Sequence, residues 1–551
     1  MNGAQALIKS LENEGVKVVF GYPGGAVLSL YEALKASNIN HILTRSEQAA
    51  AHAASGYSRV TGKPGVCLAT SGPGATNLIT GIATAYMDSI PIIAITGQVS
   101  TEMIGKDVFQ EVDITGATAP FTKHNYLVKN VKDIPRIVKE AFHIASTGRP
   151  GPVLIDIPKD VAAQELEFYY PKTVELKGYK PNYNGHPLQI NRAVEAIKRA
   201  ERPIICSGGG VISGNASSEV IKLAETCQIP VVTTLMGIGG FPGNHELFLG
   251  LVGVHGSYRA NKAISSADLI IAVGARFADR VTGGSSDFAK KAEVIHIDID
   301  PAEIGKNVEP TIPIVGDVKN VLKDILKGVD KQTRPQWIEA VNKFNSNGFK
   351  DKNNEYVKPR DVIKKLYQLT CGKAIVSTEV GQHQLWTAHY YTFSKPRTFL
   401  TSGGLGTMGY GFPAAIGAQV AKPEATVINI SGDGSFQMNL SELATAMENQ
   451  LPVKVLIFNN RCLGMVRQLQ EFYCNRNYYG VSFKNIPDFV KVAEGFGAKG
   501  FRITKDTEIE PVLKKVIDSK YPCVVDIIIA PEENVYPMVL NGSPISEMIG
   551  G

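Results

Sequence analysis

Short apolar runs alternate with helical patterns along most of the chain. The apolar runs are VKVVF, HILT, GVCLAT, IPIIAITG and GPVLIDIP, then RPIICSGGG, IPVVTT, LIIAVG and EVIHIDID, and finally ATVINI, VKVLIF and YPCVVDIII. Strands that alternate with helices in this way form parallel sheets with helices on both faces. The pattern therefore predicts an α/β fold with three doubly wound parallel-sheet domains.

Two polar stretches mark the expected domain boundaries. Residues 166–188 gain Pro, Lys and Tyr, and residues 333–355 are dominated by Lys, Asn and other polar residues. At 551 residues the chain has room for roughly three or four domains. We predict an N-terminal domain (1–165), a linker (166–188), a central domain (189–332), a second linker (333–355) and a C-terminal domain (356–551).

The composition narrows the class of protein. Hydrophobic residues make up 44% and charged residues 20% of the chain, as in ordinary globular proteins. The net charge of +5 is small and no basic run stands out, so nucleic-acid binding is not expected. The seven cysteines are scattered without a CxxC pair, which favours reduced thiols in the cytoplasm. The N-terminus predicts a helix and a strand rather than a signal peptide, and no apolar span predicts a membrane segment.

The stretch from Ser431 to Asn460 carries the clearest chemical signal. It reads SGDGSFQMNLSELATAMENQLPVKVLIFNN, with a glycine turn after one apolar run and a second run before Asn460. Asn439 and Glu442 have the spacing of a helix start, so we predict strand, turn, helix and strand. Two such strands are parallel neighbours, which would place Asp433 and Asn460 at the same edge of the sheet. Their oxygens suit Mg²⁺ shared with phosphate groups, whereas the alternative is a tight turn without a ligand.

A similar unit occurs near the N-terminus. SGPGATNLITGIATAYMDSIPIIAITG, from Ser71, repeats the order of SGxG turn, helix, proline and strand. We expect the first and third domains to share a fold, with chance similarity between two βαβ units as the alternative. Because Pro73 stands in the place of Asp433, only the C-terminal turn is expected to ligate a metal.

The GDG sequence, followed after 24 residues by Asn459-Asn460, resembles the cofactor motif of thiamine diphosphate enzymes. Other segments, among them RSEQAAAHAASG, GGLGTMGYGFPAAIGA and GARFADRVTG, resemble the catalytic large subunits of acetolactate (acetohydroxyacid) synthases over nearly the whole chain. The resemblance implies decarboxylation of pyruvate and its carboligation to a second 2-oxo acid, in branched-chain amino acid biosynthesis. It also implies a homodimer or homotetramer in which Glu47 of one chain meets Asp433 of another, with a separate regulatory subunit in many members.

The resemblance also implies how the thiamine diphosphate site is built. Glu47, after the apolar run HILT, would hydrogen-bond the pyrimidine ring, although an ordinary first-turn glutamate is the alternative. Met408 would support the bent cofactor, and Mg²⁺ would be held by Asp433, Asn460 and the carbonyl of Cys462. The full set of expected contacts is Gly24, Glu47, Gly381, Gln382, His383, Gln384, Gly406, Met408, Gly432, Asp433, Gly434, Ser435, Met438, Asn460, Gly464 and Met465.

The central region resembles the FAD-binding domain of the biosynthetic members of this family. GARFADRVTG carries most of this resemblance, although the family usually has an acidic residue at the position of Ala278. The expected FAD contacts are Arg149, Gly208, Gly209, Gly210, Thr234, Leu235, Met236, Gly253, His255, Gly274, Ala275, Arg276, Arg280, Asp298 and Asp317. A GxGxxG match in GLGTMG would instead suggest a nicotinamide dehydrogenase. That alternative is disfavoured, because the preceding run is short and no acidic residue about 20 positions on ends a second strand.

The 2-oxo acid substrates are anionic, so cationic and amide groups should line the mouth of the site. The resemblance implies Phe109, Gln110, Lys159 and Arg280 as the active-site residues there, and a guanidinium suits a carboxylate through two hydrogen bonds. The family commonly has tryptophan at the position of Leu469, so we expect pyruvate to be preferred over 2-oxobutyrate as the acceptor. Related pyruvate oxidases and glyoxylate carboligases remain alternatives, as does a non-catalytic homologue.

Overall fold

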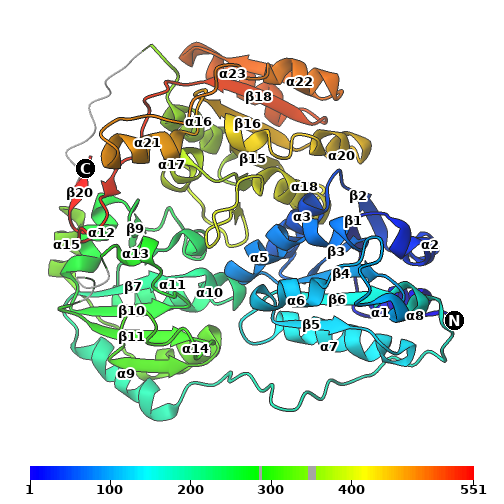
Figure 1. Ribbon diagram of the computed structural model, residues 1–551. Coiled ribbons are helices and arrows are strands. Elements are labelled where there is room, and N and C mark those ends of the chain that lie inside the picture. The colour runs from blue at the N-terminus through cyan, green and yellow to red at the C-terminus, as the bar shows by residue number, and fades with distance from the viewer. Residues whose placement is uncertain (285–287, 289, 345–354, 551) are drawn as a thin grey trace.

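The computed structural model describes residues 1–284, 288, 290–344 and 355–550. Within them the chain forms three six-stranded parallel sheets with helices on both faces, which confirms the predicted fold class (Figure 1). In Figure 1 the N-terminal sheet is blue to cyan, the central sheet green and the C-terminal sheet yellow to red. A small antiparallel pair, β19 (Met538–Val539) and β20 (Met548–Ile549), lies near the end of the chain.

The N-terminal sheet has the strand order β2-β1-β3-β4-β6-β5. Alternate residues of its strands face two separate cores: Ile93 and Ile95 belong to one cluster, whereas Ile92 and Ala94 belong to the other. This two-sided burial is why the central strands are continuous apolar runs. The strands are β1 (Val18–Tyr22), β2 (Asn40–Leu43), β3 (Gly65–Ala69), β4 (Ile92–Gln98), β5 (His124–Leu127) and β6 (Val153–Pro158).

The central sheet has a different order, β9-β8-β7-β10-β11-β12. Counted from its own first strand this is the order 3-2-1-4-5-6, in which nucleotides bind where the strand order reverses. That point lies between β7 and β10, whose residues pair from Pro203↔Leu269 to Ser207↔Val273. The strands are β7 (Pro203–Ser207), β8 (Val231–Thr233), β9 (Phe248–Leu251), β10 (Leu269–Val273), β11 (Glu293–Asp298) and β12 (Ile312–Val315).

The C-terminal sheet repeats the order of the N-terminal sheet, β14-β13-β15-β16-β18-β17. The two SGxG segments follow corresponding strands, β3 and β15, so the similarity between them reflects a shared topology. The strands are β13 (Ile375–Thr378), β14 (Phe399–Leu400), β15 (Val427–Gly432), β16 (Lys454–Asn459), β17 (Lys499–Ile503) and β18 (Cys523–Ile528).

Helices cover both faces of each sheet. In the N-terminal domain they are α1 (Gly3–Asn13), α2 (Leu28–Lys35), α3 (Glu47–Thr61), α4 (Pro73–Asn77), α5 (Ile79–Met87), α6 (Ile114–Thr118), α7 (Ile134–Ser146) and α8 (Lys159–Ala163). The next are α9 (Pro187–Arg199), α10 (Gly209–Ser213), α11 (Ser217–Cys227), α12 (Tyr258–Ser266), α13 (Asp279–Thr282), α14 (Val318–Gly328) and α15 (Pro335–Asn342). The last are α16 (Pro359–Thr370), α17 (Gln382–Tyr390), α18 (Gly411–Ala421), α19 (Asp433–Phe436), α20 (Glu442–Glu448), α21 (Gly464–Tyr473), α22 (Phe489–Gly495) and α23 (Asp506–Ile517).

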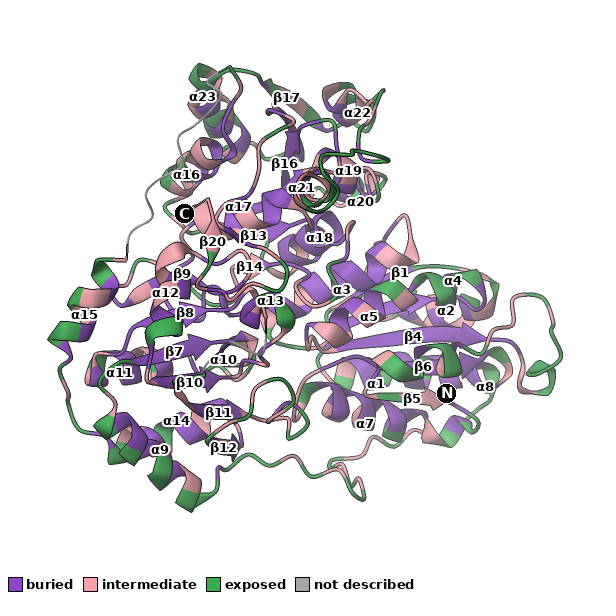
Figure 2. Cartoon of the chain, turned by 60° about the vertical axis from the view of Figure 1, so that its left-hand side comes forward, coloured by how far each residue is buried: buried purple, intermediate pink, exposed green. Residues whose placement is uncertain are grey.

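Helices α3 and α18 join the N-terminal and C-terminal domains at very short range. A Cβ added at Gly56 would collide with the backbone of Ala414, and one added at Gly417 would collide with the backbone of Ala53. The two helix backbones can approach this closely because both contact positions are glycine. Figure 2 shows both helices largely buried between the domains.

Two segments depart from the expected domain boundaries. The stretch predicted as the second linker contains α15, whose Trp337 and Val341 are buried in a core of the central domain. The C-terminal tail also returns to that domain, because Val539 donates its N–H to the carbonyl of Val254. Residues 345–354 of the predicted linker lie outside the described residues. Across the described residues, no helix combines the length and apolar character needed to cross a membrane.

Candidate active site

The GDG turn lies at the carboxyl end of β15, as predicted. Strands β15 and β16 are parallel neighbours, with Gly432 paired to Phe458, so Asp433 and Asn460 emerge at the same edge. Asp433 is the first residue of α19 and is 1% exposed. Its Oδ1 accepts the N–H of Gly434 at 2.7 Å, but its Oδ2 is buried without a hydrogen-bond partner. Burial raises the pKa of Asp433 to about 7, although hydrogen bonds from backbone N–H groups favour its charged form.

A small pocket joins this turn to two neighbouring loops. It brings together most of the expected diphosphate and metal contacts: Gly381, Gln382, His383, Met408, Gly432, Asp433, Gly434, Ser435, Asn460, Cys462, Gly464 and Met465. The Asn460 Nδ2 donates to Gln382 Oε1 at 3.4 Å, and its Oδ1 accepts the N–H of Cys462 at 3.2 Å. Burial lowers the pKa of His383 to about 3, so its imidazole is neutral beside the turn.

The helix start predicted at Asn439 and Glu442 is wrong. Helix α20 begins at Glu442 without a side-chain cap, and Asn439 instead donates to the carbonyl of Gly409 at 2.6 Å. The Glu442 carboxylate accepts the N–H groups of Arg45 and Ser46 at 2.9 and 3.1 Å, across the domain boundary. The side chains of Asn439 and Glu442 therefore make tertiary hydrogen bonds instead of capping the helix.

A second cluster forms at the carboxyl edge of the N-terminal sheet. Glu47 is the first residue of α3 and its Oε2 accepts a hydrogen bond from Asn77 Nδ2 at 3.0 Å. A Cβ at Gly74 would lie 3.3 Å from Glu47 Oε1, and one at Gly72 would lie 2.9 Å from Gln110 Cα. The sequence thus brings Glu47 and Gln110 to one SGPG turn. Glu47 is half-buried rather than enclosed, in contrast to the dry environment that its small neighbours suggested.

The remaining residues of the N-terminal half are spread around this edge. A Cβ at Gly24 would lie 2.5 Å from the side chain of Thr70, which places Gly24 against the same turn. Phe109 is 88% exposed next to Gln110, and Lys159 is exposed at the start of α8. Neither the small pocket nor the large cavity between the three domains is lined by Gly24, Glu47, Phe109, Gln110 or Lys159.

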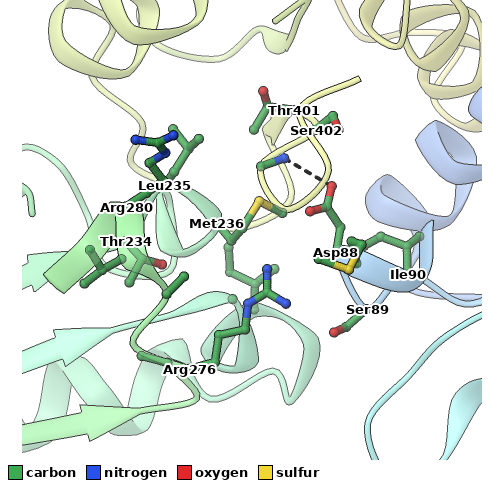
Figure 3. Close-up of a pocket in the computed structure, with 18 of the residues that line it drawn as sticks. Asp88, Ser89, Ile90, Thr234, Leu235, Met236, Arg276, Arg280, Thr401 and Ser402 are labelled. Carbon is green, nitrogen blue, oxygen red and sulfur yellow. Dashed lines mark hydrogen bonds between the residues drawn. The ribbon is translucent and has the colours of Figure 1, made fainter. Parts of the chain in front are cut away.

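A larger cavity of about 630 Å³ lies where the three domains meet. Its walls include residues from the carboxyl ends of the central strands (Figure 3). Among the expected FAD contacts it is lined by Arg149, Gly209, Gly210, Thr234, Leu235, Met236, His255, Gly274, Ala275, Arg276, Arg280 and Asp298. Gln384, Gly406, Met408 and Met465, expected at the thiamine site, also reach it. The two pockets are therefore neighbours.

Three expected FAD contacts do not line this cavity. A Cβ at Gly208 would collide with the carbonyl of Gly274, so this glycine permits two strand ends to approach each other. Gly253, with φ +119°, lies against the backbone of Arg280 in the same way. Asp317 caps α14, because its carboxylate accepts the N–H of Asn320 at 3.0 Å.

Met438, which was expected at the thiamine site, is 57% exposed outside both pockets.

Two acidic residues, Asp298 and Glu303, line part of the large cavity. Arg149, at the end of α7, pairs with Asp300 at 3.2 Å and with Glu303 at 2.7 Å. Glu303 is 4% exposed, and its Oε2 has no hydrogen-bond partner. Burial raises the pKa of the neighbouring Asp298 to about 6. Carboxylates with free lone pairs at a strand end can accept hydrogen bonds from a ligand's hydroxyl groups.

Three buried charged residues were not predicted from the sequence motifs. Arg59 and Asp88 form an ion pair at 2.5 Å on the wall of the large cavity, and both side chains are almost completely buried. Glu379 is fully buried at the end of β13. Asp88 and Glu379 each stand alone in an apolar or glycine-rich stretch, YMDSIP and TEVGQ. This position could have indicated buried charges, which require hydrogen-bond or ion-pair partners.

Comparisons with known proteins agree with this geometry. Family models for thiamine pyrophosphate enzymes match the N-terminal TPP binding domain over residues 1–117, the central domain over 190–325 and the C-terminal TPP binding domain over 379–527. A probable acetolactate synthase large subunit of Methanocaldococcus jannaschii is 52% identical, covering 100% of this chain and 95% of its own. The acetolactate synthase isozyme 3 large subunit of Escherichia coli is 45% identical, with coverages of 100% and 98%.

Proposed function

Because the chain belongs to the acetolactate synthase large-subunit family of thiamine pyrophosphate enzymes, we propose that it decarboxylates pyruvate and joins the two-carbon unit to a second 2-oxo acid. Pyruvate as the acceptor gives 2-acetolactate, and 2-oxobutyrate gives 2-aceto-2-hydroxybutyrate. The observation that carries the proposal is the unpaired, buried carboxylate oxygen of Asp433 in a glycine-lined pocket. The full-length match confirms the family resemblance seen in the sequence.

The residues of the small pocket fit a magnesium diphosphate. Removing the Asp433 carboxylate from water without a partner is costly, and a bound cation would offset that cost. Asn460 Oδ1 and the carbonyl of Cys462 would add neutral oxygen ligands, leaving places for water and phosphate oxygens. Among the described residues, no group of three or more His, Cys, Asp or Glu could hold a metal. Sharing Mg²⁺ with a ligand's phosphates suits such a donor set.

The chain's own groups would then divide the chemical work. Thiamine diphosphate, when bound, supplies a carbon nucleophile and takes up the electron pair released as CO₂ leaves. The Glu47 carboxyl would share a proton with the pyrimidine ring. Gly381 and the GDG turn would admit the diphosphate closely, while Met408 would pack against the bent cofactor and exclude water. His383 would contribute a neutral hydrogen-bonding ring rather than a charge.

The large cavity supports FAD as a second bound cofactor. Its volume, about 630 Å³, lies within the range of roughly 300–1,000 Å³ that is usual for ligand pockets. The unpaired Glu303 Oε2 and the central strand order both suit a nucleotide. Carboligation involves no net oxidation, so we assign the flavin a structural role. A flavin spectrum of the purified protein, lost on denaturation and filtration, would support this assignment.

Arg280 and α21 would select the second 2-oxo acid. Arg280 lines the large cavity beside Leu235 and its side chain is 72% exposed, so it can reach an anion (Figure 3). Leu469 lines the same cavity and is 38% exposed. Because leucine offers a smaller surface than tryptophan, we propose that pyruvate is favoured over 2-oxobutyrate. A strong preference for 2-oxobutyrate in a competition assay would contradict this part of the proposal.

We further propose a homodimer or homotetramer in which the two half-sites meet. Glu47 does not line the small pocket that contains Asp433, and the apolar side chains of Phe109 and Met438 are exposed in the single chain. The relatives are named large subunits, which supports a separate regulatory subunit for this chain too. The scattered free cysteines support a cytoplasmic location.

One experiment tests the proposed activity. Purified protein is incubated with pyruvate, with and without thiamine diphosphate, Mg²⁺ and FAD, and acetolactate is measured. We expect acetolactate only when thiamine diphosphate and Mg²⁺ are both present. Acetyl phosphate with peroxide would indicate a pyruvate oxidase instead, and tartronate semialdehyde from glyoxylate would indicate a glyoxylate carboligase.

A further inference from the structure

The segment Gly403–Phe412 connects β14 to α18 and reaches both pockets. It carries Gly406 and Met408, and most of it has no helix or strand of its own. Gly406 and Gly409 have φ values of +72° and +87°, so the backbone turns sharply at two places. A segment of this kind takes its shape from the groups that bind its backbone N–H groups.

Asp88, from the N-terminal domain, binds the start of this segment. Its Oδ1 accepts the N–H of Gly404 at 2.7 Å and its Oδ2 accepts that of Gly403 at 3.3 Å. Figure 3 shows the Asp88 side chain directed at this loop across the cavity wall, with a hydrogen bond drawn between them. The Asp88 side chain is 0% exposed, and Arg59 Nη2 donates to it at 2.5 Å. Arg59 in turn lies over the ring of Tyr410, 5.3 Å from its centroid.

Glu379, from the C-terminal domain, binds the other end. Its two oxygens accept the N–H of Gly409 at 2.7 Å and that of Phe412 at 3.0 Å. Its own N–H donates to the carbonyl of Ile430 in β15, so its position is fixed by the sheet. Val380 and Gly381 follow directly and line the small pocket. Glu379 thus links the loop beside the diphosphate site to the segment that carries Met408.

We propose that Asp88 and Glu379 are positioning residues that hold the Gly403–Phe412 segment from both ends and so fix Met408 between the two pockets. The proposal rests on the proposed function, because it assumes that Met408 meets the thiamine cofactor. Four backbone N–H groups point at the two carboxylates, and hydrogen bonds to an ionised group are stronger than neutral ones. Burial raises the pKa of Glu379 to about 7, so its carboxylate is ionised when the test is run at pH 8. Asp88 makes the position of Met408 depend on the N-terminal domain.

The test replaces each carboxylate by its amide, in Glu379→Gln and Asp88→Asn. The amides keep the size, lose the charge and present an NH₂ group to a backbone N–H. Hydrogen exchange of residues 403–412 in the cofactor-free protein should become roughly tenfold faster or more, since each variant weakens two charge-assisted hydrogen bonds. Trp386 lines the small pocket, so its fluorescence can report titration with thiamine diphosphate and Mg²⁺. The concentration for half-saturation should rise, and kcat should fall at saturating cofactor.

Glu508→Gln is the matched control. Glu508 also accepts two backbone N–H groups, from Thr504 at 2.7 Å and Lys505 at 3.2 Å, but on the exposed surface of the C-terminal domain. Its variant should leave exchange at 403–412, cofactor titration and kcat unchanged. Glu379→Ala should be impaired more than Glu379→Gln, because the glutamine retains one oxygen that can accept a hydrogen bond.

Two results would overturn the proposal. One is unchanged exchange at 403–412 in both amide variants. The other is a loss of activity that follows only the folded fraction, with kcat per folded molecule and cofactor titration as in the wild type. If Asp88→Asn leaves Arg59 buried without its partner and does not fold, the double variant Arg59→Met with Asp88→Asn tests the same two backbone bonds. A wild-type protein that makes no acetolactate would reject the proposed function, while the exchange data would still report on the two carboxylates.

Discussion

The N-terminal and C-terminal domains have the same strand order, but their third strands end in turns of different chemistry. Pro73 and Asp433 occupy the same place, the first residue of the helix after the turn. Proline suits this place because a helix does not use its first N–H groups, yet it offers no side-chain oxygen. One side chain therefore decides which copy of the turn can take a cation.

The glycines around the two turns serve different neighbours. Gly72 has φ +58°, and a side chain there would meet Gln110, while one at Gly74 would approach Glu47. The space beside the N-terminal turn is therefore occupied by residues of the same domain, Gln110 and Glu47. At the C-terminal turn, Asp433 keeps one buried oxygen without a hydrogen-bond partner. Under the proposed function, one topology would therefore support proton transfer at the N-terminal sheet and metal binding at the C-terminal sheet.

Glu47→Gln should give the largest effect, because it removes proton sharing and leaves the metal site intact. General acid–base catalysis contributes roughly 10²–10⁴-fold, so we expect a loss of kcat in that range. Titration of Trp386 fluorescence with thiamine diphosphate and Mg²⁺ should remain close to that of the wild type. Steady-state kinetics of acetolactate formation provide the measurement.

A first-turn glutamate elsewhere gives the control for Glu47. Glu219 stands in the first turn of α11 in the central domain, so Glu219→Gln removes a comparable charge near a helix start. It should leave kcat unchanged. If Glu47→Gln were as active as Glu219→Gln, Glu47 would be an ordinary helix-terminal residue and the proposed division between the two domains would be wrong.

Asp433→Asn should act in the opposite way, by weakening metal binding. Loss of even an outer-shell partner costs roughly 10–100-fold in metal affinity, and we expect a loss of about 10²-fold for this direct ligand. The cofactor-free variant should melt at a higher temperature than the wild type above pH 7, because a buried carboxylate with a raised pKa has been removed. Thermal scans with and without Mg²⁺ and thiamine diphosphate measure both effects. Equal stabilisation of both proteins by the ligands would show that Asp433 does not bind the metal.

The sequence was informative where strands are buried on both faces. Strand β4, for instance, is continuously apolar because clusters on both sides cover it. The edge strands β5, β9, β12, β14 and β17 were missed because they are short and most are only partly buried. The internal strand β13 was also missed, although it is fully buried, because it has only four residues. Helix α15 was read as linker because only Trp337 and Val341 of its residues are buried.

The candidate site shows the same limit. Asp433 and Asn460 could be paired from their spacing, because the βαβ unit fixes the relation between its two strand ends. The contacts of Asp88 and Glu379 could not be predicted, because their partners are backbone N–H groups that lie 30 or more positions away or in another domain. Asn439 and Glu442 misled for the same reason, as their side chains bind Gly409 and Arg45.

An arginine from each outer domain contacts the central domain, and substituting these two arginines should lower the stability of the protein by different amounts. Arg149 meets the carboxylates of Asp300 and Glu303, whereas Arg397 donates to neutral groups, the carbonyl of Ile212 and the side chain of Asn215. Arg149→Gln leaves the buried Glu303 with less compensation and should lower stability by about 2 kcal/mol. Arg397→Gln should cost about 1 kcal/mol, as expected for neutral hydrogen bonds.

Salt separates these two arginine variants. Ionic screening weakens the charged contacts of Arg149, so the difference between wild type and Arg149→Gln should shrink as NaCl is raised. The difference for Arg397→Gln should change less. Thermal melting of the cofactor-free proteins at two salt concentrations measures both, and a salt-independent Arg149→Gln effect would contradict the ion-pair explanation.

A difference that appears only as the pH changes comes from a pair of aspartates at the fourth position of corresponding strands, Asp156 in β6 and Asp526 in β18. Asp526 has Arg502 beside it at 3.1 Å, whereas Asp156 is bound by the neutral side chains of Thr96 and Gln98. Burial without a cation raises the pKa of Asp156 to about 7. Its unfolded value is about 3.9, so between these values the folded chain binds more protons than the unfolded chain.

Stability from Asp156 is therefore complete below about pH 4 and is lost as the pH rises through about 7. We expect Asp156→Asn to flatten the pH dependence of cofactor-free stability over this window, by at most about 1.4 kcal/mol per pH unit. Asp156 lines neither the small pocket nor the large cavity, so Mg²⁺ and thiamine diphosphate should not alter this difference. Melting temperatures from pH 5 to pH 8, with and without ligands, provide the measurement. Parallel pH curves for wild type and Asp156→Asn would mean that Asp156 is ionised throughout, and that the two sheets differ less than their aspartate partners indicate.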